Sequence, residues 1–340
     1  MTKGTALVTG ATGFIASRLV PALLDEGWAV RACGRRDRPA EFPTSVDYRA
    51  VDLVESEQLG PMFDGVTDLF HLAGASSSTS SDDEMHQANV VATERLLEAA
   101  PRDHLERVVH MSSTSVYGEE AQLPLPVRED VEPHPSRGYG KAKWETEQVV
   151  WEQGRAGMPV VVVRPASVYG PGNIKLLASA VLDVAIEAFA AVPAIAVPAE
   201  PVEQRLVHID GLVRACVHLA RDEAAVGRAF NVVAEAYPSS HEIARILAEQ
   251  FGMDVELSDD TDCGLAFEER KTVHDTMVGD GMEPRILLTE ERFRFMRKTN
   301  RNNRVSVDAL LDTGFRFAET DLEASIGRTV AWYRDHRWVI

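Results

Sequence analysis

The chain has 340 residues, of which 45% are hydrophobic, so it is long and apolar enough to bury one large core or two modest ones. Its formal charge of −18 disfavours partners with a phosphate backbone, and we expect no nucleic-acid binding. No apolar run is long enough to span a bilayer, and the three cysteines lack a metal-ligand spacing. We therefore expect a cytoplasmic protein with free thiols, no membrane partner and no metal site.

The N-terminal residues predict a strand, a helix and a second strand. Residues 5–9 are short, apolar and β-branched, as in a buried parallel strand. Apolar residues then recur at helical spacing from Phe14 to Leu24, and Gly27 ends the helix. Residues 28–33 are the expected second strand. The glycines of this unit lie at its first turn, between strand and helix.

The glycine turn, residues 9–16, fits a dinucleotide. Gly10 allows a sharp turn out of the strand, and Gly13 lets the backbone approach a diphosphate at the positive end of the helix. An ordinary strand-to-helix turn is the alternative, because two glycines alone are weak evidence. We assign cofactor contacts at this turn to Gly10, Thr12, Gly13, Phe14 and Ile15.

The end of the second strand indicates which dinucleotide is bound. An acid at this position usually holds a free ribose 2′-hydroxyl, but here Arg35 and Arg36 come first and no acid occurs before Asp37. Two guanidiniums favour a 2′-phosphate, so we expect NADP(H), with NAD(H) as the alternative. Asp52 and Leu53, after a third strand, are expected at the adenine.

A fourth strand, residues 68–74, leads into a serine-rich loop, residues 75–81, that suits the region beside the nicotinamide ribose. His71 is expected to be a packed strand residue rather than a catalyst. We assign Leu72, Ala73 and Gly74 to the cofactor and Ser76 to the substrate.

Two later segments carry chemistry. The strand from Val108 ends in hydroxyl side chains at the sheet edge where open α/β sheets bind ligands. Tyr139 and Lys143 are four apart, so on a helix they share one face. A nearby ammonium and an oxidised nicotinamide would lower the pKa of Tyr139, which could then exchange a proton with a substrate hydroxyl held by Ser113.

These features together resemble the extended short-chain dehydrogenase/reductases grouped as NAD-dependent epimerase/dehydratases. The resemblance covers nearly the whole chain. It rests on Thr9-Gly10-x-x-Gly13-x-x-Ala16, Asp52-Leu53, His71-Leu72-Ala73-Gly74, Asn89, Ser112-Ser113-x-x-Val116-Tyr117-Gly118, Tyr139-x-x-x-Lys143, Arg164-Pro165-x-x-x-Tyr169-Gly170-Pro171 and Arg205-x-x-His208-Ile209-Asp210.

The resemblance implies an α/β fold, with a doubly wound parallel-sheet Rossmann domain and a smaller C-terminal α/β substrate domain. It implies that Ser113, Tyr139 and Lys143 are catalytic. It also places several residues at the cofactor in addition to those named above, namely Asn89, Met111, Tyr139, Lys143, Pro165 and Val168. Relatives often dimerise, so a homodimer is expected.

Departures from the family pattern narrow the reaction. Dehydratases of the family place an acid directly after the catalytic Ser or Thr, but this chain has Thr114 and Ser115 there. A dehydratase is therefore disfavoured, and hydride exchange at a carbinol carbon remains.

Two substrate signals disagree. Nucleotide-sugar members usually carry Asn where this chain has Ser167, whereas Arg205 fits their diphosphate-binding arginine. We expect a nucleotide-activated sugar, in a 4-epimerase or 4-ketoreductase reaction, and keep an NADPH-dependent ketoreductase of a non-nucleotide ketone as the alternative. The expected substrate contacts are Ser76, Ser113, Thr114, Ser167, Asn173 and Arg205.

The expected division places residues 1–166 and about 204–234 in the dinucleotide-binding domain, and about 167–203 and 235–340 in the substrate-binding part. Within the latter, residues 176–191 predict a helix and 194–201 a proline-rich loop or plain core. Residues 253–301 predict either a lid or, more commonly, a solvated variable region.

Overall fold

The computed structural model describes residues 3–75, 81–118, 123–258, 264–293 and 304–340. The chain forms two compact units, each built from several chain segments. Unit 1 comprises residues 1–166, 210–233 and 304–316, and unit 2 comprises residues 167–209, 234–303 and 317–340.

Unit 1 contains a seven-stranded parallel sheet in the order β10-β6-β5-β4-β1-β2-β3. The strands are β1 (Thr5–Thr9), β2 (Ala29–Gly34), β3 (Asp47–Ala50), β4 (Asp68–His71), β5 (Arg107–Met111), β6 (Val160–Pro165) and β10 (Ala229–Val232). The order 3-2-1-4-5-6 with one added strand is that of a doubly wound dinucleotide-binding sheet, and it reverses between β1 and β4. The expected Rossmann architecture is confirmed.

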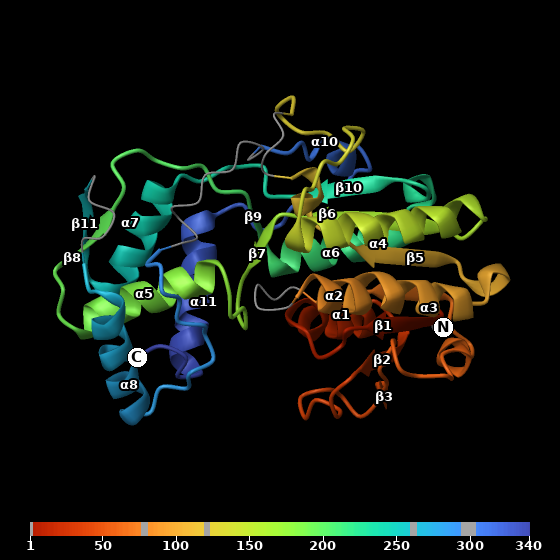
Figure 1. The fold of residues 1–340 in the computed structure, drawn as a ribbon, viewed down its shortest axis with the longest axis horizontal. Coiled ribbons are helices and arrows are strands. Elements are labelled where there is room, and N and C mark those ends of the chain that lie inside the picture. The colour runs from red at the N-terminus through yellow and green to blue at the C-terminus, as the bar shows by residue number, and fades with distance from the viewer. Residues whose placement is uncertain (1–2, 76–80, 119–122, 259–263, 294–303) are drawn as a thin grey trace. The chain divides into compact units, whose positions relative to one another are not determined.

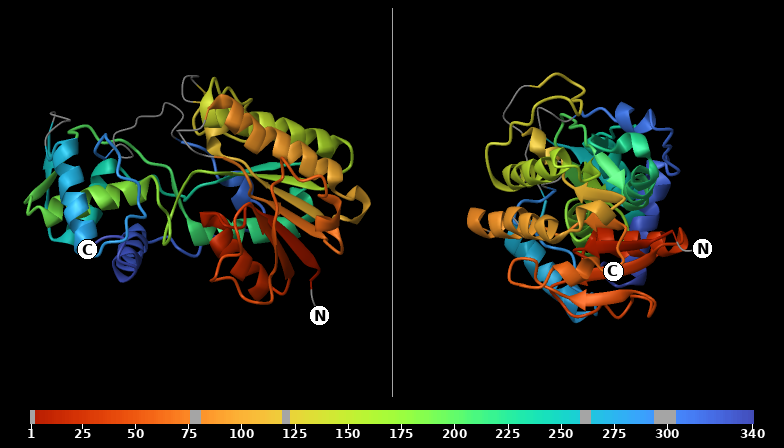
Figure 2. Two further views of the ribbon diagram at one scale, coloured as in Figure 1. Left: turned by 60° about the horizontal axis from the view of Figure 1, so that its bottom comes forward. Right: turned by 90° about the vertical axis from the view of Figure 1, so that its right-hand side faces the viewer.

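Helices cover both faces of this sheet (Figure 2). They are α1 (Phe14–Asp25), α2 (Asp82–His86), a π-helical turn (Gln87–Val91), α3 (Ala92–Ala99), α4 (Gly138–Arg155), α6 (Ile209–Arg221) and α10 (Asp308–Leu311). Short 3₁₀ turns lie at Gly60–Phe63, Arg102–His104, Thr114–Tyr117 and Glu223–Ala225. Helices α3 and α4 lie side by side on one face (Figure 1), where their apolar residues cover the β-branched strands.

Unit 2 is built around its own core. Its strands form two parallel pairs, β7 (Ser167–Tyr169) with β9 (Leu206–His208) and β8 (Ala194–Val197) with β11 (Asp254–Leu257). Its helices are α5 (Leu177–Phe189), α7 (Ser240–Phe251), α8 (Phe267–Gly279) and α11 (Leu322–Asp335). Ser239 caps α7 by accepting a hydrogen bond from the Glu242 backbone N–H, as a helix start at a serine predicts.

Helix α5 lies almost wholly in this core and buries two carboxylates. Arg270 of α8 donates to Asp183 at 2.7 Å, and Arg292 pairs with Glu187. The two buried guanidiniums compensate the charges of Asp183 and Glu187. The two acids can therefore stay buried although they interrupt the apolar sequence of α5. Helix α8 packs against α5, and Met277, Met282, Ile286 and Phe293 join the core of unit 2, so the expectation of a solvated region is wrong for this buried side of residues 267–293.

Residues 194–197 form a buried strand that pairs with β11 along its length, so of the two alternatives for this segment plain core, not a loop, is confirmed at these positions. The domain division differs from the structure at one segment. Residues 304–316, which the sequence placed with the substrate part, belong to unit 1. Val305 bridges to Val127, and the Ser306 carbonyl accepts from the Asn231 side chain beside the main sheet.

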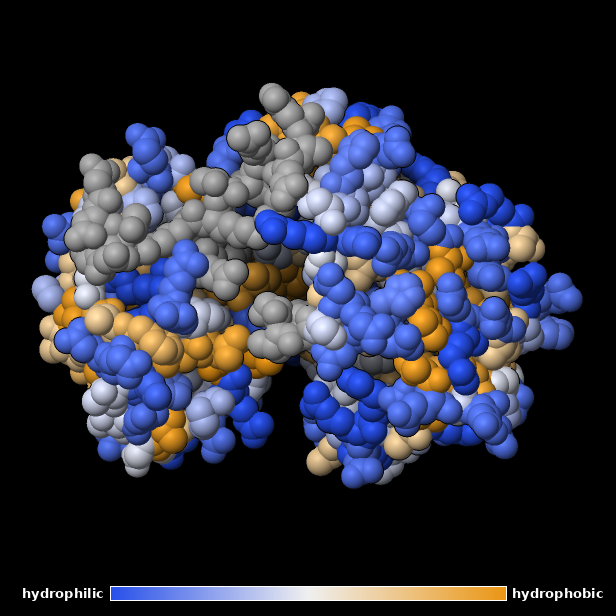
Figure 3. Space-filling model, viewed as in Figure 1, coloured by the Kyte–Doolittle hydropathy of each residue, from blue (hydrophilic) through white to orange (hydrophobic). Residues whose placement is uncertain are grey.

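Among the described residues, no helix has both the length and the apolar character needed to cross a membrane. The face in view in Figure 3 is mostly hydrophilic, in keeping with the acidic composition. Cys33 and Cys216 are buried free thiols, and burial raises the pKa of each to about 12, so neither is a reactive thiolate.

Candidate active site

The expected catalytic residues of unit 1 meet at the carboxyl edge of β5. Ser113 follows β5, is nearly buried and caps the 3₁₀ turn by accepting from the Ser115 backbone N–H at 3.1 Å. Tyr139 lies in the first turn of α4, and its hydroxyl shares a hydrogen bond with Ser113. The two hydroxyls are thus adjacent, as a pair that grips one substrate oxygen requires. Thr114, an expected substrate contact, is buried within the 3₁₀ turn.

Lys143 lies one turn further along α4 and is buried. Its Nζ donates to the Met111 carbonyl at 2.9 Å and lies 5.9 Å from the centre of the Tyr139 ring. The structure thus brings Ser113, Tyr139, Lys143 and Met111 together, although the role of each in catalysis or cofactor binding is still a prediction.

The pKa of Tyr139 is high in the protein without ligands. Burial raises it to about 12, and the hydrogen bond with Ser113 lowers it only in part. Burial also lowers the pKa of Lys143 to about 8, opposed by the charge of Glu147. The predicted lowering of this pKa concerns Tyr139 beside bound oxidised nicotinamide and stays a prediction; without ligands burial dominates, and the Lys143 ammonium donates to a carbonyl.

Asn89 and Gly74 line the space around the Lys143 ammonium. Asn89 sits in a π-helical turn, a feature frequent at functional sites, and its amide donates to the carbonyls of Met85 and Ala75. Its buried Oδ1 has no hydrogen-bond partner among the described residues. A Cβ at Gly74 would lie 2.5 Å from this oxygen and 3.3 Å from Lys143 Nζ. Gly74 therefore lies in close contact with Asn89, and a larger residue at this position would clash with the Asn89 side chain.

His71 joins the glycine loop to this turn. The Thr93 hydroxyl donates to the Asn89 carbonyl at 2.5 Å, so its oxygen accepts from His71 Nε2–H at 2.8 Å. His71 Nδ1 then accepts from the Thr9 hydroxyl at 2.7 Å, and the Thr9 oxygen accepts from the backbone N–H groups of residues 72–73. This series of hydrogen bonds requires His71 to be neutral, and burial lowers the pKa of His71 to about 3. His71 is a packed strand residue, as expected.

His110 offers a test of this buried region. It is fully buried beside His71, with ring centres 5.4 Å apart, and neither ring nitrogen has a partner in the described chain. Burial lowers its pKa well below 6.5, so the unfolded state binds the proton first as pH falls. Both histidines therefore cost stability progressively below about pH 6.5.

We expect His110→Leu to raise the Tm, and to raise it more at pH 5 than at pH 8, since it removes an unsatisfied polar group and one of the two titrations. Thermal unfolding at both pH values measures this. The Tm of the wild type should fall further from pH 8 to pH 5 than the Tm of the variant. A fall in the variant that equals or exceeds that of the wild type would contradict the assignment of His110 as a neutral, unsatisfied histidine.

The glycine turn fits a dinucleotide on three observations. Gly10 has a φ of +65°, and a Cβ there would lie 2.8 Å from the Ala73 backbone nitrogen, so this strand end and the β4 loop touch closely. Gly13 precedes α1 without a side-chain cap, and the first turn of α1 holds no acid. The helix N-terminus therefore points its N–H groups and dipole at the turn without a side chain of its own to satisfy them.

The arginine pair expected at the adenine end begins near this turn. Arg35 and Arg36 are exposed and follow Gly34 directly. A Cβ at Gly34 would lie 3.3 Å from Thr12 Cγ2, which places the start of the arginine pair beside the glycine turn. One carboxylate oxygen of Asp52 accepts a hydrogen bond from the Val54 backbone N–H at 2.8 Å, and Leu53 is buried.

The expected residues of unit 2 have structural partners. Ser167 and Val168 lie in β7, and the Ser167 backbone N–H donates to the Arg205 carbonyl at 3.2 Å. Asn173 is buried, its Oδ1 accepts from the Lys175 N–H and its amide donates to the Val168 carbonyl. Asn173 therefore holds the loop before α5. Ser76 lies outside the described residues.

Sequence reasoning missed the role of Glu147 and saw Arg164 only as a motif residue. Both are buried, and Arg164 donates to Glu147 from two nitrogens, at 3.0 and 2.7 Å. The available signal was spacing, because Glu147 follows Lys143 by four residues, as Lys143 follows Tyr139.

Comparison with known proteins adds a family. The model of the NAD dependent epimerase/dehydratase family matches residues 6–233. A ketoreductase of 4-hydroxy-2-methyl-3-oxo-4-farnesyl-3,4-dihydroquinoline-1-oxide from Stigmatella aurantiaca is 32% identical over 50% of this chain and 52% of its own. The UDP-glucose 4-epimerase of Mycolicibacterium smegmatis is 32% identical over 72% of this chain and 82% of its own.

The chain spans only about half the length of several curated relatives that it matches, the Stigmatella ketoreductase among them. Among solved structures, MoeE5 in complex with UDP-glucose and NAD is similar with a TM-score of 0.72 and 26% identity, over 98% of this chain and 99% of MoeE5.

Proposed function

The chain belongs to the NAD-dependent epimerase/dehydratase family, and we propose that it moves a hydride between a nicotinamide and a secondary alcohol or ketone of a nucleotide-activated sugar, as a 4-epimerase or 4-ketoreductase. The observation that carries the proposal is the meeting of Ser113, Tyr139 and Lys143 at the carboxyl edge of β5. A bound nicotinamide dinucleotide would accept a hydride from a carbinol carbon or return one to a carbonyl carbon.

In this proposal Ser113 and Tyr139 hold the substrate oxygen, and Tyr139 exchanges the proton. Tyr139 is protonated at neutral pH in the protein without ligands, since its pKa is about 12. It is therefore ready to donate its proton to the oxygen of a ketone as that oxygen gains charge. Lys143, protonated below about pH 8, adds a positive charge beside the ring and a donor for the cofactor's ribose.

Asn89 Oδ1 would accept a hydrogen bond from the nicotinamide ribose beside Gly74, and the glycine turn would take the diphosphate. We also propose that Pro165, which ends β6, and Val168 in unit 2 lie against the nicotinamide, with Leu53 and Asp52 at the adenine.

The arginine pair supports NADP(H) over NAD(H), and it gives a prediction. Arg35→Ala combined with Arg36→Ala is expected to weaken NADPH binding by at least about 10-fold, because charge-assisted hydrogen bonds to the 2′-phosphate are lost. NADH binding should change by less than about 2-fold. Titration of intrinsic fluorescence with each coenzyme measures both, and an equal loss for the two would assign the arginines to something other than the 2′-phosphate.

The substrate class rests on similarity and on Arg205. The epimerase relative and MoeE5 are both described with UDP-glucose, and both matches extend well beyond the dinucleotide-binding segment. We propose that Arg205 holds the diphosphate of the sugar nucleotide, with Ser167 and Asn173 at the same site and Ser76 and Thr114 near the sugar. Ser167, Asn173 and Arg205 all belong to unit 2.

A second candidate is an NADPH-dependent ketoreductase of a non-nucleotide ketone. Ser167 in place of Asn, the arginine pair and the similarity to the Stigmatella ketoreductase favour it. The two candidates differ in their response to nucleotides. UDP or dTDP should raise the Tm of an enzyme for sugar nucleotides and leave a ketoreductase of another ketone unchanged.

The deciding experiment incubates the enzyme with UDP-glucose carrying deuterium at C4. Conversion to the C4 epimer with the deuterium retained at C4, or net transfer of deuterium from C4 to the coenzyme, supports the nucleotide-sugar proposal. Neither epimer nor deuterated coenzyme, together with no Tm change from UDP or dTDP, contradicts it and leaves the second candidate. A homodimer and a cytoplasmic location are still predictions, for which size-exclusion chromatography with light scattering and cell fractionation are the tests.

A further inference from the structure

Helix α4 is joined to the end of β5 by three consecutive residues. Lys143 Nζ donates to the Met111 carbonyl, Ser112 Oγ donates to Glu147, and Ser113 shares a hydrogen bond with Tyr139. On α4 the three partners are spaced four residues apart and face the same side. Each turn of this helix face is therefore fixed to one residue of the strand end.

Glu147 is the innermost of the three. Its side chain is fully buried, and Ser112 Oγ and Arg164 Nε both donate to its Oε1, Arg164 at 3.0 Å. Arg164 Nη2 and, at 3.4 Å, Trp151 Nε1 donate to its Oε2. Both oxygens are thus satisfied, as a buried carboxylate requires, and they tie α4 to β5 and β6 together.

Arg164 is held on its other side as well. Its Nη1 donates to the Tyr117 hydroxyl at 3.0 Å and to the Glu129 carbonyl at 3.3 Å. The Tyr117 hydroxyl donates to Asn231 Oδ1 at 2.8 Å, and the Asn231 amide donates to the Ser306 carbonyl at 3.1 Å. The Arg164 guanidinium that binds Glu147 is therefore held by hydrogen bonds that run from the turn after β5, through β10, to Ser306. This leaves little freedom for the Glu147 carboxylate.

Glu147 also sets the charge near Lys143. His71 of β4 and His110 of β5 are the titratable side chains that face Lys143 from the sheet, and both are neutral at neutral pH because burial lowers the pKa of each. Glu147, on the same helix, favours the ammonium, while Arg164 from β6 faces Glu147. The carboxylate is the negative charge that acts on the buried ammonium.

We propose that Glu147 is a positioning residue for the reaction: its carboxylate locks the helix bearing Tyr139 and Lys143 onto the strand end bearing Ser113, and it keeps the buried Lys143 protonated. This inference rests on the proposed function, since it takes Tyr139 and Lys143 as the working pair. A merely structural ion pair predicts a loss of stability alone, because removing one partner leaves a buried charge. A positioning role also predicts a change in the pH dependence of turnover.

The test is the pH profile of kcat in Glu147→Gln, with NADPH affinity and Tm measured beside it. The amide keeps the shape and removes the charge. We expect the alkaline limb, which follows deprotonation of Lys143, to move down by about 1 pH unit. At pH 8 kcat should fall about 5-fold, while the Kd for NADPH stays within about 3-fold. Glu147→Asp restores the charge and should return the limb toward that of the wild type.

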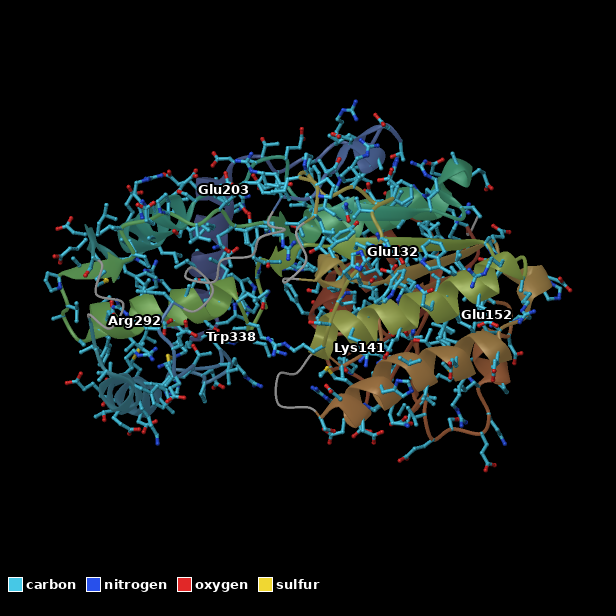
Figure 4. All side chains as sticks on the ribbon, turned by 45° about the horizontal axis from the view of Figure 1, so that its top comes forward. Glu132, Lys141, Glu152, Glu203, Arg292 and Trp338 are labelled. Carbon is cyan, nitrogen blue, oxygen red and sulfur yellow. The ribbon has the colours of Figure 1, made fainter. Side chains whose placement is uncertain are left out.

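The matched control is Glu152→Gln, a charge removal at an exposed position further along α4, where Figure 4 labels Glu152 and Lys141 near opposite ends of the helix. Its profile should equal that of the wild type. Ser112→Ala removes one anchor and keeps every charge, so it should lower kcat and leave the limb in place.

An unmoved limb and unchanged kcat in Glu147→Gln, with only the Tm lowered, would overturn the proposal. Should Glu147→Gln fail to fold, Ser112→Ala decides: kcat equal to that of the wild type in this variant also overturns it. Full activity in Tyr139→Phe would instead overturn the proposed function, so the two failures are distinguishable.

Discussion

Tyr139→Phe is expected to lower kcat by about 10²- to 10⁴-fold, the usual contribution of a positioned acid or base. The substitution deletes one oxygen atom, which shares a hydrogen bond with Ser113. It removes the proton donor for the substrate oxygen but leaves Lys143 on the Met111 carbonyl. NADPH affinity should therefore change by less than about 3-fold. Steady-state assays at saturating coenzyme measure kcat, and a separate titration with NADPH measures the affinity.

The control for the loss of a buried tyrosine hydroxyl is Tyr169→Phe. The Tyr169 hydroxyl bonds Ser325 at 2.7 Å in unit 2, so its loss should lower the Tm slightly and leave kcat within about 3-fold. Equal kcat values for Tyr139→Phe and Tyr169→Phe would contradict a proton-transfer role for Tyr139.

Gly10→Ala is expected to abolish dinucleotide binding and to destabilise the fold by about 1–3 kcal/mol or more. Two effects add at this position. A φ of +65° is unfavourable for alanine, and the new Cβ would lie 2.8–2.9 Å from backbone atoms of Leu72 and Ala73, which cannot rotate away. The β4 loop must shift, and it forms one wall of the expected cofactor site. Calorimetric titration with NADPH and thermal unfolding measure the two effects.

Gly65→Ala is the matched control, because Gly65 has a similar φ of +71° with nothing within 4 Å of its added Cβ. It carries the backbone strain without the clash and lies in a loop away from the glycine turn. It should lower the Tm and leave NADPH affinity unchanged. NADPH affinity preserved in Gly10→Ala would show that the turn does not contact the coenzyme.

The parts that the sequence predicted depend on local pattern. The strand, helix and strand of residues 5–34 could be read from an apolar run, helical spacing and a stop at Gly27, and β1 and α1 start at the expected residues. A spacing of four residues on one helix predicted that Tyr139 and Lys143 lie close together. A strand that ends in hydroxyl side chains predicted the place of Ser113 at the carboxyl end of that strand.

The parts that it missed depend on tertiary partners. Asp183 and Glu187 read as polar interruptions, because nothing local shows that Arg270 and Arg292, about a hundred residues later in the chain, neutralise them. For the same reason Glu147 was not singled out, since its partner Arg164 lies on another element. The sequence also gave no sign that burial raises the pKa of Tyr139 to about 12 in the protein without ligands, because burial depends on the packing of the whole unit.

The most direct test of a hydride-transfer enzyme with its dinucleotide site at residues 9–16 is a count of bound nucleotide. Purified protein is denatured, and any released nucleotide is identified by absorbance and mass; protein found empty is then titrated with NADPH and NADH. We predict one nicotinamide dinucleotide per chain, released or titrated. Tightly held coenzyme favours an epimerase, and an empty protein that prefers NADPH favours a reductase. Protein that releases none and binds neither coenzyme would contradict the dinucleotide site and the chemistry built on it.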